Sequence, residues 1–453
     1  MNLHRLLLKR AVASKPVRVV LIGAGKFGSM YLAQARVTPG IHVVAVADLS
    51  PQRARDALAR TGWPLEQYAA ASLSDALAHG STFITDDAAA LISAGPVEVV
   101  IDATGSPAAG IHHALACAVN GKHIVMVNVE ADALAGPLLA RRCADAGVVY
   151  SLAWGDQPAL ICEMVDWARA AGFEVIAAGK GTKYLPGYHQ STPETVWGHY
   201  GFTPEMVAAG DFNAQMFNSF LDGTKSAIEM AAVANATGLA PAPEGLLFPP
   251  CGVDDLARVL RPRADGGQLH HAGQVEVISS VERDGRPVCR DLRWGVYVTF
   301  APADHGNASN RAYVERCFKE YGLVTDPSGH TTAMYKPCHL IGLELGISVA
   351  SAALRHEPTG APDVWLGDVA AIAKRDLAVG ETLDGEGGYT VYGRLMPAAD
   401  SRRIGALPIG LAHGVKLGNA VRQGEAVRWQ DVIIDESSEV VRVRREMEAA
   451  FAP

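Results

Sequence analysis

The stretch "RVVLIGAGKFGSMYLAQ", residues 18–34, places Gly23, Gly25 and Gly28 between an apolar run and an amphipathic segment. The run is rich in β-branched residues and of strand length, and the residues after the glycines have the apolar spacing of a helix. In this context the first glycine allows a tight turn, the second lets the backbone approach a pyrophosphate, and the third lets the helix pack closely on the strand. The stretch predicts the first β-turn-α unit of a dinucleotide-binding fold.

The alternation of apolar strands and helices continues beyond this unit. Further strands are expected at "IHVVAVADLS" (41–50), "PVEVVIDATG" (96–105), "KHIVMVNVE" (122–130) and "VVYSLAW" (148–154), with helical patterns between them. Strands that alternate with helices predict right-handed crossovers and a parallel sheet with helices on both faces. We therefore expect an α/β protein whose N-terminal Rossmann domain spans residues 1–155.

Several polar residues follow the predicted strands at the edge where such a sheet binds its cofactor. Asp48 ends the second strand about 20 residues after the last glycine, where an acid would bond the adenosine ribose. Ser50 and Arg53 follow at once and could receive a 2′-phosphate, so the choice between NAD and NADP stays open. The expected cofactor-binding residues are Gly23, Ala24, Gly25, Lys26, Phe27, Gly28, Asp48, Ser50, Arg53, Thr104, Gly105 and Asn128.

Composition excludes several classes of partner. The chain has 453 residues, 49% of them apolar, and a formal net charge of -8, so it offers no basic field for nucleic acid. The longest apolar stretch, 340–354, contains Glu344 and is shorter than the roughly 20 residues that a bilayer requires. The seven cysteines include no C-x-x-C pair. We expect a cytoplasmic protein that contacts neither nucleic acid nor membrane and acts on a small molecule.

The sequence changes character after residue 155. Residues 155–172 read as a helix, and further strands are expected from Phe173, at 273–281 and at 293–300. This part, 156–365, is the expected α+β substrate and dimerisation domain. Whether the apolar helix at about 339–355 folds back onto the first domain is left open. Residues 366–453 show short strands and closely spaced glycines, typical of a small β-rich module, followed by a charged C-terminal helix.

Two segments of the second domain supply candidates for chemistry. Hydride transfer to a carbonyl needs a proton donor or an electrophile beside the developing alkoxide. In "GKGTKYLPGYH" (179–189), Lys180 and Lys183 are expected on a flexible loop as a substrate anion clamp, or else as solvated lysines. In "FNAQMFNSFLDGTKSAIEM" (212–230), polar residues interrupt an apolar segment at helical spacing. Lys225 with Asp222 is the expected catalytic pair, Asn218 and Ser219 are expected substrate contacts, and an exposed face with an ion pair is the alternative.

Two more groups of residues complete the predicted site. Tyr335, Lys336 and His339 precede the apolar helix, whose N-terminus favours anions, so a phosphate-binding role and a structural capping role for the histidine are both open. Glu130 and Asp156 lie near the carboxyl ends of predicted strands, where open α/β sheets bind ligands. Glu130 is therefore a catalytic candidate, and both residues could contribute to a divalent metal site. No histidine cluster at ligand spacing accompanies them.

The chain resembles the deoxyxylulose-phosphate reductoisomerase-like (DRL) family, which is distantly similar to homoserine dehydrogenases. "GAGKFG" (23–28), the stretch 127–160, "GKGTKYLP" (179–186) and the stretch 211–239 carry this resemblance. From about Val369 to Ile434 the chain resembles a SAF domain, the small β-clip module at the end of sialic acid synthases. Homoserine dehydrogenases have a lysine directly after the asparagine that corresponds to Asn128, whereas Val129 stands here, which argues against homoserine oxidation.

The resemblance implies an activity and an assembly. A founding activity of the family is the NADPH-dependent reductive isomerisation of 1-deoxy-D-xylulose 5-phosphate to 2-C-methyl-D-erythritol 4-phosphate in isoprenoid biosynthesis. A homodimer, and NADPH as the preferred cofactor, are further expectations from resemblance alone. The alternatives are a catabolic dehydrogenase of a polyol or sugar acid and a non-catalytic protein that only senses the nucleotide.

Overall fold

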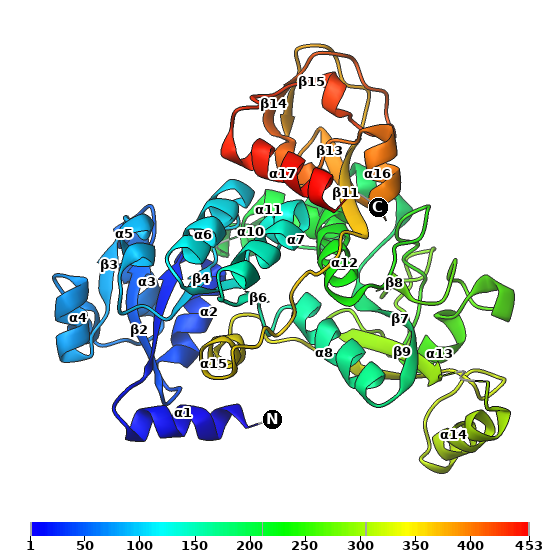
Figure 1. Cartoon of the computed structure of the whole chain (residues 1–453). Helices are drawn as coiled ribbons and strands as arrows, with labels where there is room; N and C mark the ends of the chain where they lie inside the picture. The colour runs from blue at the N-terminus through cyan, green and yellow to red at the C-terminus, as the bar shows by residue number, and fades with distance from the viewer. Residues whose placement is uncertain (1, 211, 304–305, 452–453) are drawn as a thin grey trace. The chain divides into compact units, whose positions relative to one another are not determined.

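A computed structural model describes residues 2–210, 212–303 and 306–451, and these form two compact units. The first unit comprises the chain up to Leu160 together with His339–Asp363 and Arg442–Ala450. The second comprises Ile161–Cys338 and Val364–Val441. Figure 1 labels most of the elements of both units.

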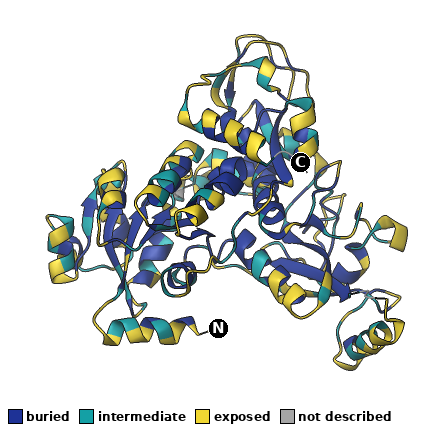
Figure 2. Cartoon of the chain, viewed as in Figure 1, coloured by how far each residue is buried: buried dark blue, intermediate teal, exposed yellow. Residues whose placement is uncertain are grey.

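The first unit is built on a six-stranded parallel sheet of order β3-β2-β1-β4-β5-β6, which confirms the predicted α/β fold with its Rossmann-like sheet. The predicted strand runs reappear as five of its strands, and the short β3 was not expected. Most strand residues are buried, as expected for a parallel sheet covered on both faces (Figure 2). The strands are β1 Val17–Ile22, β2 Ile41–Ala47, β3 Phe83–Thr85, β4 Val99–Asp102, β5 His123–Met126 and β6 Tyr150–Leu152.

The helices of this unit pack as two sets. One set, α1, α2, α3 and α15, shares a core with the sheet. In the second set, α6 contacts both α5 and α7. Helix α15 contacts β1, β4, β5 and β6, so the late apolar helix lies on the first sheet. No helix of the described residues has both the length and the apolar character that a membrane span needs. The helices are α1 Leu3–Val12, α2 Lys26–Ala35, α3 Pro51–Arg60, α4 Leu73–His79, α5 Ala88–Ser93, α6 Pro107–Val119, α7 Val129–Asp145, α15 Gly346–Arg355 and α17 Glu439–Ala450.

The second unit contains a four-stranded mixed sheet of order β10-β9-β7-β8. Strands β8 and β9 are buried along their whole length, so both of their faces are covered within one chain. Helix α8, Gln157–Ala170, leads into this sheet from the first unit. The other elements are β7 Phe173–Thr182, β8 Gln274–Ser279, β9 Val296–Pro302, β10 Thr332–Lys336, α9 Val196–Tyr200, α10 Pro204–Ala209, α11 Ala214–Leu221, α12 Thr224–Thr237, α13 Leu256–Val259 and α14 Ala308–Glu320.

The C-terminal segment adds two small sheets to the second unit, β11-β13 and β12-β14-β15. Strands β11 and β13 contact helix α12, so this segment packs on the helical part of the second unit. Its likeness to a SAF domain, and the division of the chain into three domains, stay predictions. The elements are β11 Gly367–Ala373, β12 Thr382–Asp384, β13 Val391–Pro397, β14 His413–Leu417, β15 Val432–Ile433 and α16 Ala398–Ile404.

Candidate nucleotide and substrate sites

The glycine-rich turn lies between β1 and α2, and its glycines differ in what holds them. Gly23 has φ +97°, and a Cβ there would lie 2.5 Å from the carbonyl oxygen of Ala103. A Cβ on Gly28 would lie 2.4 Å from the carbonyl oxygen of Gly23. A Cβ on Gly25 would meet no heavy atom within 4 Å. The fold itself therefore requires Gly23 and Gly28, whereas Gly25 leaves the backbone at the start of α2 open to a ligand.

Asp48 is buried beside this turn and is fixed by the backbone. Its Oδ2 accepts a hydrogen bond of 2.9 Å from the N–H of Ala24, and its Oδ1 accepts one of 2.9 Å from the N–H of Ser50. The guanidinium of Arg53 lies 3.8 Å from Oδ1 and is largely exposed. The carboxylate is therefore held next to the turn, with a cation beside it. Lys26 is exposed and Phe27 half-buried in the first turn of α2.

A polar network at the carboxyl end of β4 was not recognised in the sequence. Asp102 is fully buried, its Oδ2 pairs with Nδ1 of His113, and its Oδ1 accepts from the N–H and the hydroxyl of Thr104 at 3.1 and 2.8 Å. Asn128 donates to the Thr104 hydroxyl at 3.2 Å and to the carbonyl of Ser106 at 2.7 Å. The network fixes the predicted cofactor contacts Thr104 and Asn128 in one place. Gly105 follows with φ +68°.

Lys180 does not lie on a loop, as the sequence analysis expected, because β7 continues through Thr182. Its ammonium group forms an ion pair with Glu229 of α12, and both side chains are almost fully buried. Lys183 lies just after the strand and donates to the carbonyl oxygen of His199. The assigned role of both lysines in substrate binding stays a prediction.

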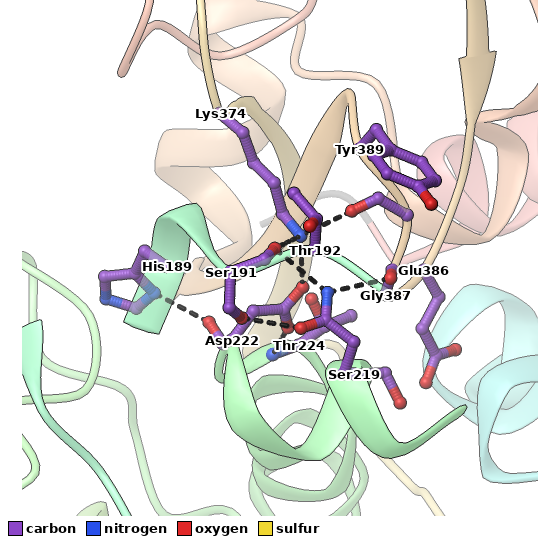
Figure 3. Close-up of polar contacts among 12 residues, drawn as sticks. His189, Ser191, Thr192, Ser219, Asp222, Thr224, Lys374, Glu386, Gly387 and Tyr389 are labelled. Atoms are coloured by element: carbon purple, nitrogen blue, oxygen red, sulfur yellow. Dashed lines mark hydrogen bonds and ion pairs between the residues drawn. The ribbon is translucent and has the colours of Figure 1, made fainter. Parts of the chain in front are cut away.

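Asp222 pairs with a lysine that the sequence analysis did not consider. Lys374 follows β11, and its Nζ lies 2.8 Å from Oδ2 of Asp222, with 2% and 0% of the two side chains exposed (Figure 3). The same ammonium group donates to the carbonyl oxygens of Ser191 at 2.8 Å and Gly388 at 2.7 Å. Burial raises the pKa of Asp222, and the contact with Lys374 opposes this shift. The ammonium group thus donates to two carbonyl oxygens and meets the Asp222 carboxylate as an ion pair.

The other predicted residues of this segment lie close to the same pair. Asn218 is buried and donates to the carbonyl oxygens of Ser191 at 3.0 Å and Gly387 at 2.8 Å. The hydroxyl of Ser219 donates to the carbonyl of Met216 at 2.8 Å. Lys225 is half-buried in the first turn of α12. Asn218 and Ser219 thus contact the main chain, and their role and that of Lys225 toward a substrate stay predictions.

A tyrosine and a histidine near Asp222 form a dyad that sequence analysis also missed. The Nδ1 of His189 lies 2.7 Å from the carbonyl oxygen of Asp222, and its Nε2 lies 2.9 Å from the hydroxyl of Tyr184. Because a carbonyl only accepts, Nδ1 carries a proton. Burial lowers the pKa of His189, so the ring is neutral and its Nε2 accepts a hydrogen bond from the Tyr184 hydroxyl. Both residues lie in "GKGTKYLPGYH", where they follow the two lysines that were predicted to bind the substrate anion.

Tyr335, Lys336 and His339 lie apart from the helix that they were expected to precede directly. Helix α15 begins only at Gly346, since residues 341–345 form turns. Lys336 ends β10 and pairs with Glu163, and Tyr335 is exposed on the same strand. Lys336 and His339 are therefore outside the first turn of α15, contrary to the expectation. Their substrate-binding role stays a prediction.

The acidic candidates for a metal site lie in the first unit. Glu130 is half-buried in the first turn of α7, and Asp156 is buried, where its Oδ1 accepts from the N–H of Gln157 at the start of α8. Over the described residues, no group of three or more His, Cys, Asp or Glu side chains could hold a metal ion. The structure thus offers no ligand set to assign to a divalent cation within those residues.

Comparison with known proteins gives one family match. A family model described as the catalytic domain of the oxidoreductase DRL matches residues 155–345, which is less than half of the chain. The matched range contains every residue predicted for catalysis or substrate binding except Glu130. The match supports an oxidoreductase enzyme. None of the curated proteins compared with the chain matches it.

Several solved structures show weak likenesses. An NAD-binding oxidoreductase from Klebsiella pneumoniae is 18% identical, with 38% of this chain and 44% of that chain covered and a TM-score of 0.28. A probable dehydrogenase from Thermotoga maritima is 15% identical over 44% and 54% of the two chains, with a TM-score of 0.27. A myo-inositol dehydrogenase from Lactobacillus casei is 18% identical over 40% and 50%, with a TM-score of 0.26. The matches span about half the length of these structures, and likenesses of this size say nothing about activity.

Proposed function

We propose that this chain is an NAD(P)-dependent oxidoreductase that acts on a small polyhydroxylated, phosphorylated carbonyl compound. The observation that carries the proposal is the open Gly25 at the N-terminus of α2, between two glycines that the fold requires. Backbone N–H groups at such a helix start favour a pyrophosphate. The match of residues 155–345 to an oxidoreductase catalytic domain supports the second part of the proposal.

The residues of the first unit fit a nicotinamide dinucleotide. The turn Gly23–Gly28 would hold the pyrophosphate, Asp48 the adenosine ribose, and Thr104 and Asn128 the nicotinamide riboside. The bound cofactor would donate or accept a hydride. NADPH is the proposed form on the family resemblance. The charges at this place are divided, since Arg53 offers a cation for a 2′-phosphate and Asp48 would repel one.

We take the reductive isomerisation of 1-deoxy-D-xylulose 5-phosphate as the most concrete reaction. The family resemblance supports it, and the buried polar groups around Asp222 supply a dry, charged environment in which proton transfer could be controlled. Lys225, Asp222 and Glu130 stay the proposed catalytic residues. A homodimer stays a proposal as well.

Turnover tests this reaction. Purified full-length protein is mixed with NADPH, Mg²⁺ and 1-deoxy-D-xylulose 5-phosphate, and NADPH absorbance and the mass of the product are followed. The proposal predicts NADPH oxidation with formation of 2-C-methyl-D-erythritol 4-phosphate, and Lys225→Met should lower the rate by orders of magnitude with NADPH affinity intact. If NADPH is oxidised with a polyol-derived ketone or a sugar acid but not with 1-deoxy-D-xylulose 5-phosphate, the result favours the alternative, a polyol or sugar-acid dehydrogenase. If the protein binds NADPH but turns over none of these compounds, the result would contradict the proposal that it is an enzyme.

A further inference from the structure

Two arginines of the second unit lie against the same loop, Gly245–Phe248. Arg283 donates from Nη2 to the carbonyl oxygens of Leu247 at 2.9 Å and Phe248 at 3.0 Å. The side chain of Arg394, on β13, packs beside Gly245, where its Cγ lies 3.4 Å from the position of an added Cβ. Arg283 comes from the part that matches the oxidoreductase family, and Arg394 comes from the C-terminal segment. The loop therefore packs against arginine side chains from two distant parts of the sequence.

The loop is itself held in a fixed conformation. Phe248 adopts φ +51°, and Glu276, fully buried on β8, accepts hydrogen bonds from the N–H groups of Leu247 at 3.0 Å and Phe248 at 3.3 Å. A non-glycine residue with positive φ is strained and persists where its surroundings hold it. The carbonyl oxygens that orient Arg283 are thus fixed before any ligand binds.

An aromatic floor with hydrogen-bonding groups adjoins the arginines. The ring of Tyr184 stacks on Phe248 with 3.9 Å between centroids, and the Arg283 guanidinium lies 5.7 Å from the Tyr184 centroid. The ring of Tyr392 stacks on His189 at 4.4 Å. Tyr392 and Arg394 are two residues apart on β13 and share one face of the strand. The phenol oxygens of Tyr184 and Tyr392 could accept hydrogen bonds from the hydroxyl groups of a polyol beside an anion on the arginines, whereas both ring nitrogens of His189 are already engaged.

The nearby lysines are already engaged, whereas the arginines have no acidic partner. Lys374 is paired with Asp222 and donates to two carbonyl groups, and Lys180 is paired with Glu229 inside the unit. For Arg283 and Arg394, no carboxylate of the described residues lies within ion-pair distance. Arginine presents a planar fork that binds the oxygens of a phosphate or carboxylate in pairs. Of these lysines and arginines, the two arginines are therefore the ones whose positive charge is not already paired with a carboxylate of the described residues.

We propose that Arg283 and Arg394 form an oxyanion subsite that binds the phosphate or carboxylate group of the substrate, with Tyr184, His189 and Tyr392 beside it. The inference rests on the proposed function, because it assigns an anionic substrate to that enzyme. It also gives the C-terminal segment a role, since that segment supplies Arg394 and Tyr392. The subsite differs from the anion clamp of lysines that the sequence predicted.

Calorimetric titration with inorganic phosphate, and separately with glycolate, tests the subsite in full-length protein at low ionic strength, where charge interactions are least screened. Arg394→Gln and Arg283→Gln should each weaken binding of at least one of these anions about tenfold or more, because a charge-assisted fork is lost. Arg394→Lys, which keeps the charge and loses the fork, should weaken it less. Loss of phosphate binding alone identifies a phosphorylated substrate, and loss of glycolate binding a sugar acid, and either supports the subsite.

Matched controls are available on the same segments. Arg286→Gln removes an exposed arginine three residues from Arg283, and Arg402→Gln removes an exposed arginine on α16 of the C-terminal segment. Both controls should bind the anions as the parent protein does, and circular dichroism should show all variants folded. Unchanged affinity in either Arg283→Gln or Arg394→Gln, or no anion binding by the parent protein up to tens of millimolar, would overturn the two-arginine subsite.

NADPH titration of the same proteins separates this inference from the proposed function. NADPH binding that persists while the anions fail to bind would overturn the subsite and leave the oxidoreductase standing. Anion binding that depends on both arginines, in protein that does not bind NADPH, would uphold the subsite and remove the proposed enzyme. Phosphate bound at the glycine-rich turn is unaffected by either replacement, so it does not enter the difference between parent and variants.

Discussion

Asp132 shows how far one buried side chain can depart from its ordinary chemistry. It lies in α7 with no exposed surface, and its Oδ1 accepts a hydrogen bond of 2.9 Å from the hydroxyl of Tyr150. Its Oδ2 has no hydrogen-bond partner among the described residues. Burial raises the pKa of Asp132 to about 7, so the folded protein holds a proton that an unfolded chain would release near pH 4.

This shift makes stability depend on pH with a definite sign. Because the folded pKa is raised, the contribution of Asp132 is fully present below about pH 4 and is lost as pH rises to about 7. Asp132→Asn removes this loss, because asparagine does not ionise. The free energy of unfolding of the variant should equal that of the parent near pH 4 and should be larger at pH 8 by on the order of 1–3 kcal/mol. Urea unfolding at both pH values measures the difference.

A neighbouring group and a surface control keep this measurement interpretable. Burial also raises the pKa of Glu276 to about 7, but that carboxyl titrates in parent and variant alike, so the difference reports Asp132. Asp145→Asn, at the exposed end of the same helix, should shift stability by less than about 0.5 kcal/mol at both pH values. An Asp132→Asn variant that is less stable than the parent at pH 8 would show that the carboxylate is charged and favourable in the fold.

At the scale of elements, local patterns explain what could be predicted. The strand from Val17 and the glycines after it are neighbours in sequence, so the turn and the parallel sheet followed from periodicity. The helix start at Gly346 was misjudged, because the apolar run begins earlier as turns. Strand β7 was expected to end before Lys180, because a lysine reads as a surface residue until its buried partner is known.

The pairs that form the candidate site join elements far apart in the chain. Lys374 follows β11, whereas Asp222 ends α11, and nothing local in either segment reveals the other. Lys225 was the predicted partner of Asp222 because it lies three residues further along the same segment. Long-range burial decides which cation meets which carboxylate, and one sequence carries no signal for it.

The Lys374–Asp222 pair yields a prediction about the contact between these elements. Lys374→Met leaves a fully buried carboxylate without its cation, so it should lower the free energy of unfolding by about 3–5 kcal/mol. Adding Asp222→Asn should restore part of the loss, because the uncompensated charge is gone. Unfolding by urea, monitored by circular dichroism, measures both.

An adjacent ion pair provides the comparison. Arg375 pairs with Glu381 and is half exposed, so Arg375→Gln should cost less than about 1 kcal/mol. If Lys374→Met cost no more than Arg375→Gln, or if Asp222→Asn worsened the double variant, the pair would not be the buried contact that the structure shows.

At the scale of the whole molecule, the two units divide the proposed work. The first carries a parallel sheet and a glycine-rich turn suited to a nucleotide, and the second carries buried ion pairs, a tyrosine–histidine dyad and two arginines without acidic partners among the described residues. The C-terminal segment shares the second unit and contributes Lys374 and Arg394. The chemistry of a small anionic substrate and of a nicotinamide cofactor would thus be drawn from segments across the whole chain.

Calorimetric titration of NADPH into the full-length parent, Gly25→Ala and Gly95→Ala shows whether the glycine-rich turn binds a nicotinamide dinucleotide. A Cβ meets no heavy atom within 4 Å at either glycine, so both variants should keep the parent's stability. We expect NADPH to bind the parent and Gly95→Ala equally, and to bind Gly25→Ala at least about tenfold more weakly, because the new Cβ stands where the pyrophosphate approaches. Equal NADPH affinity in all three proteins, or no NADPH binding by the parent, would contradict it.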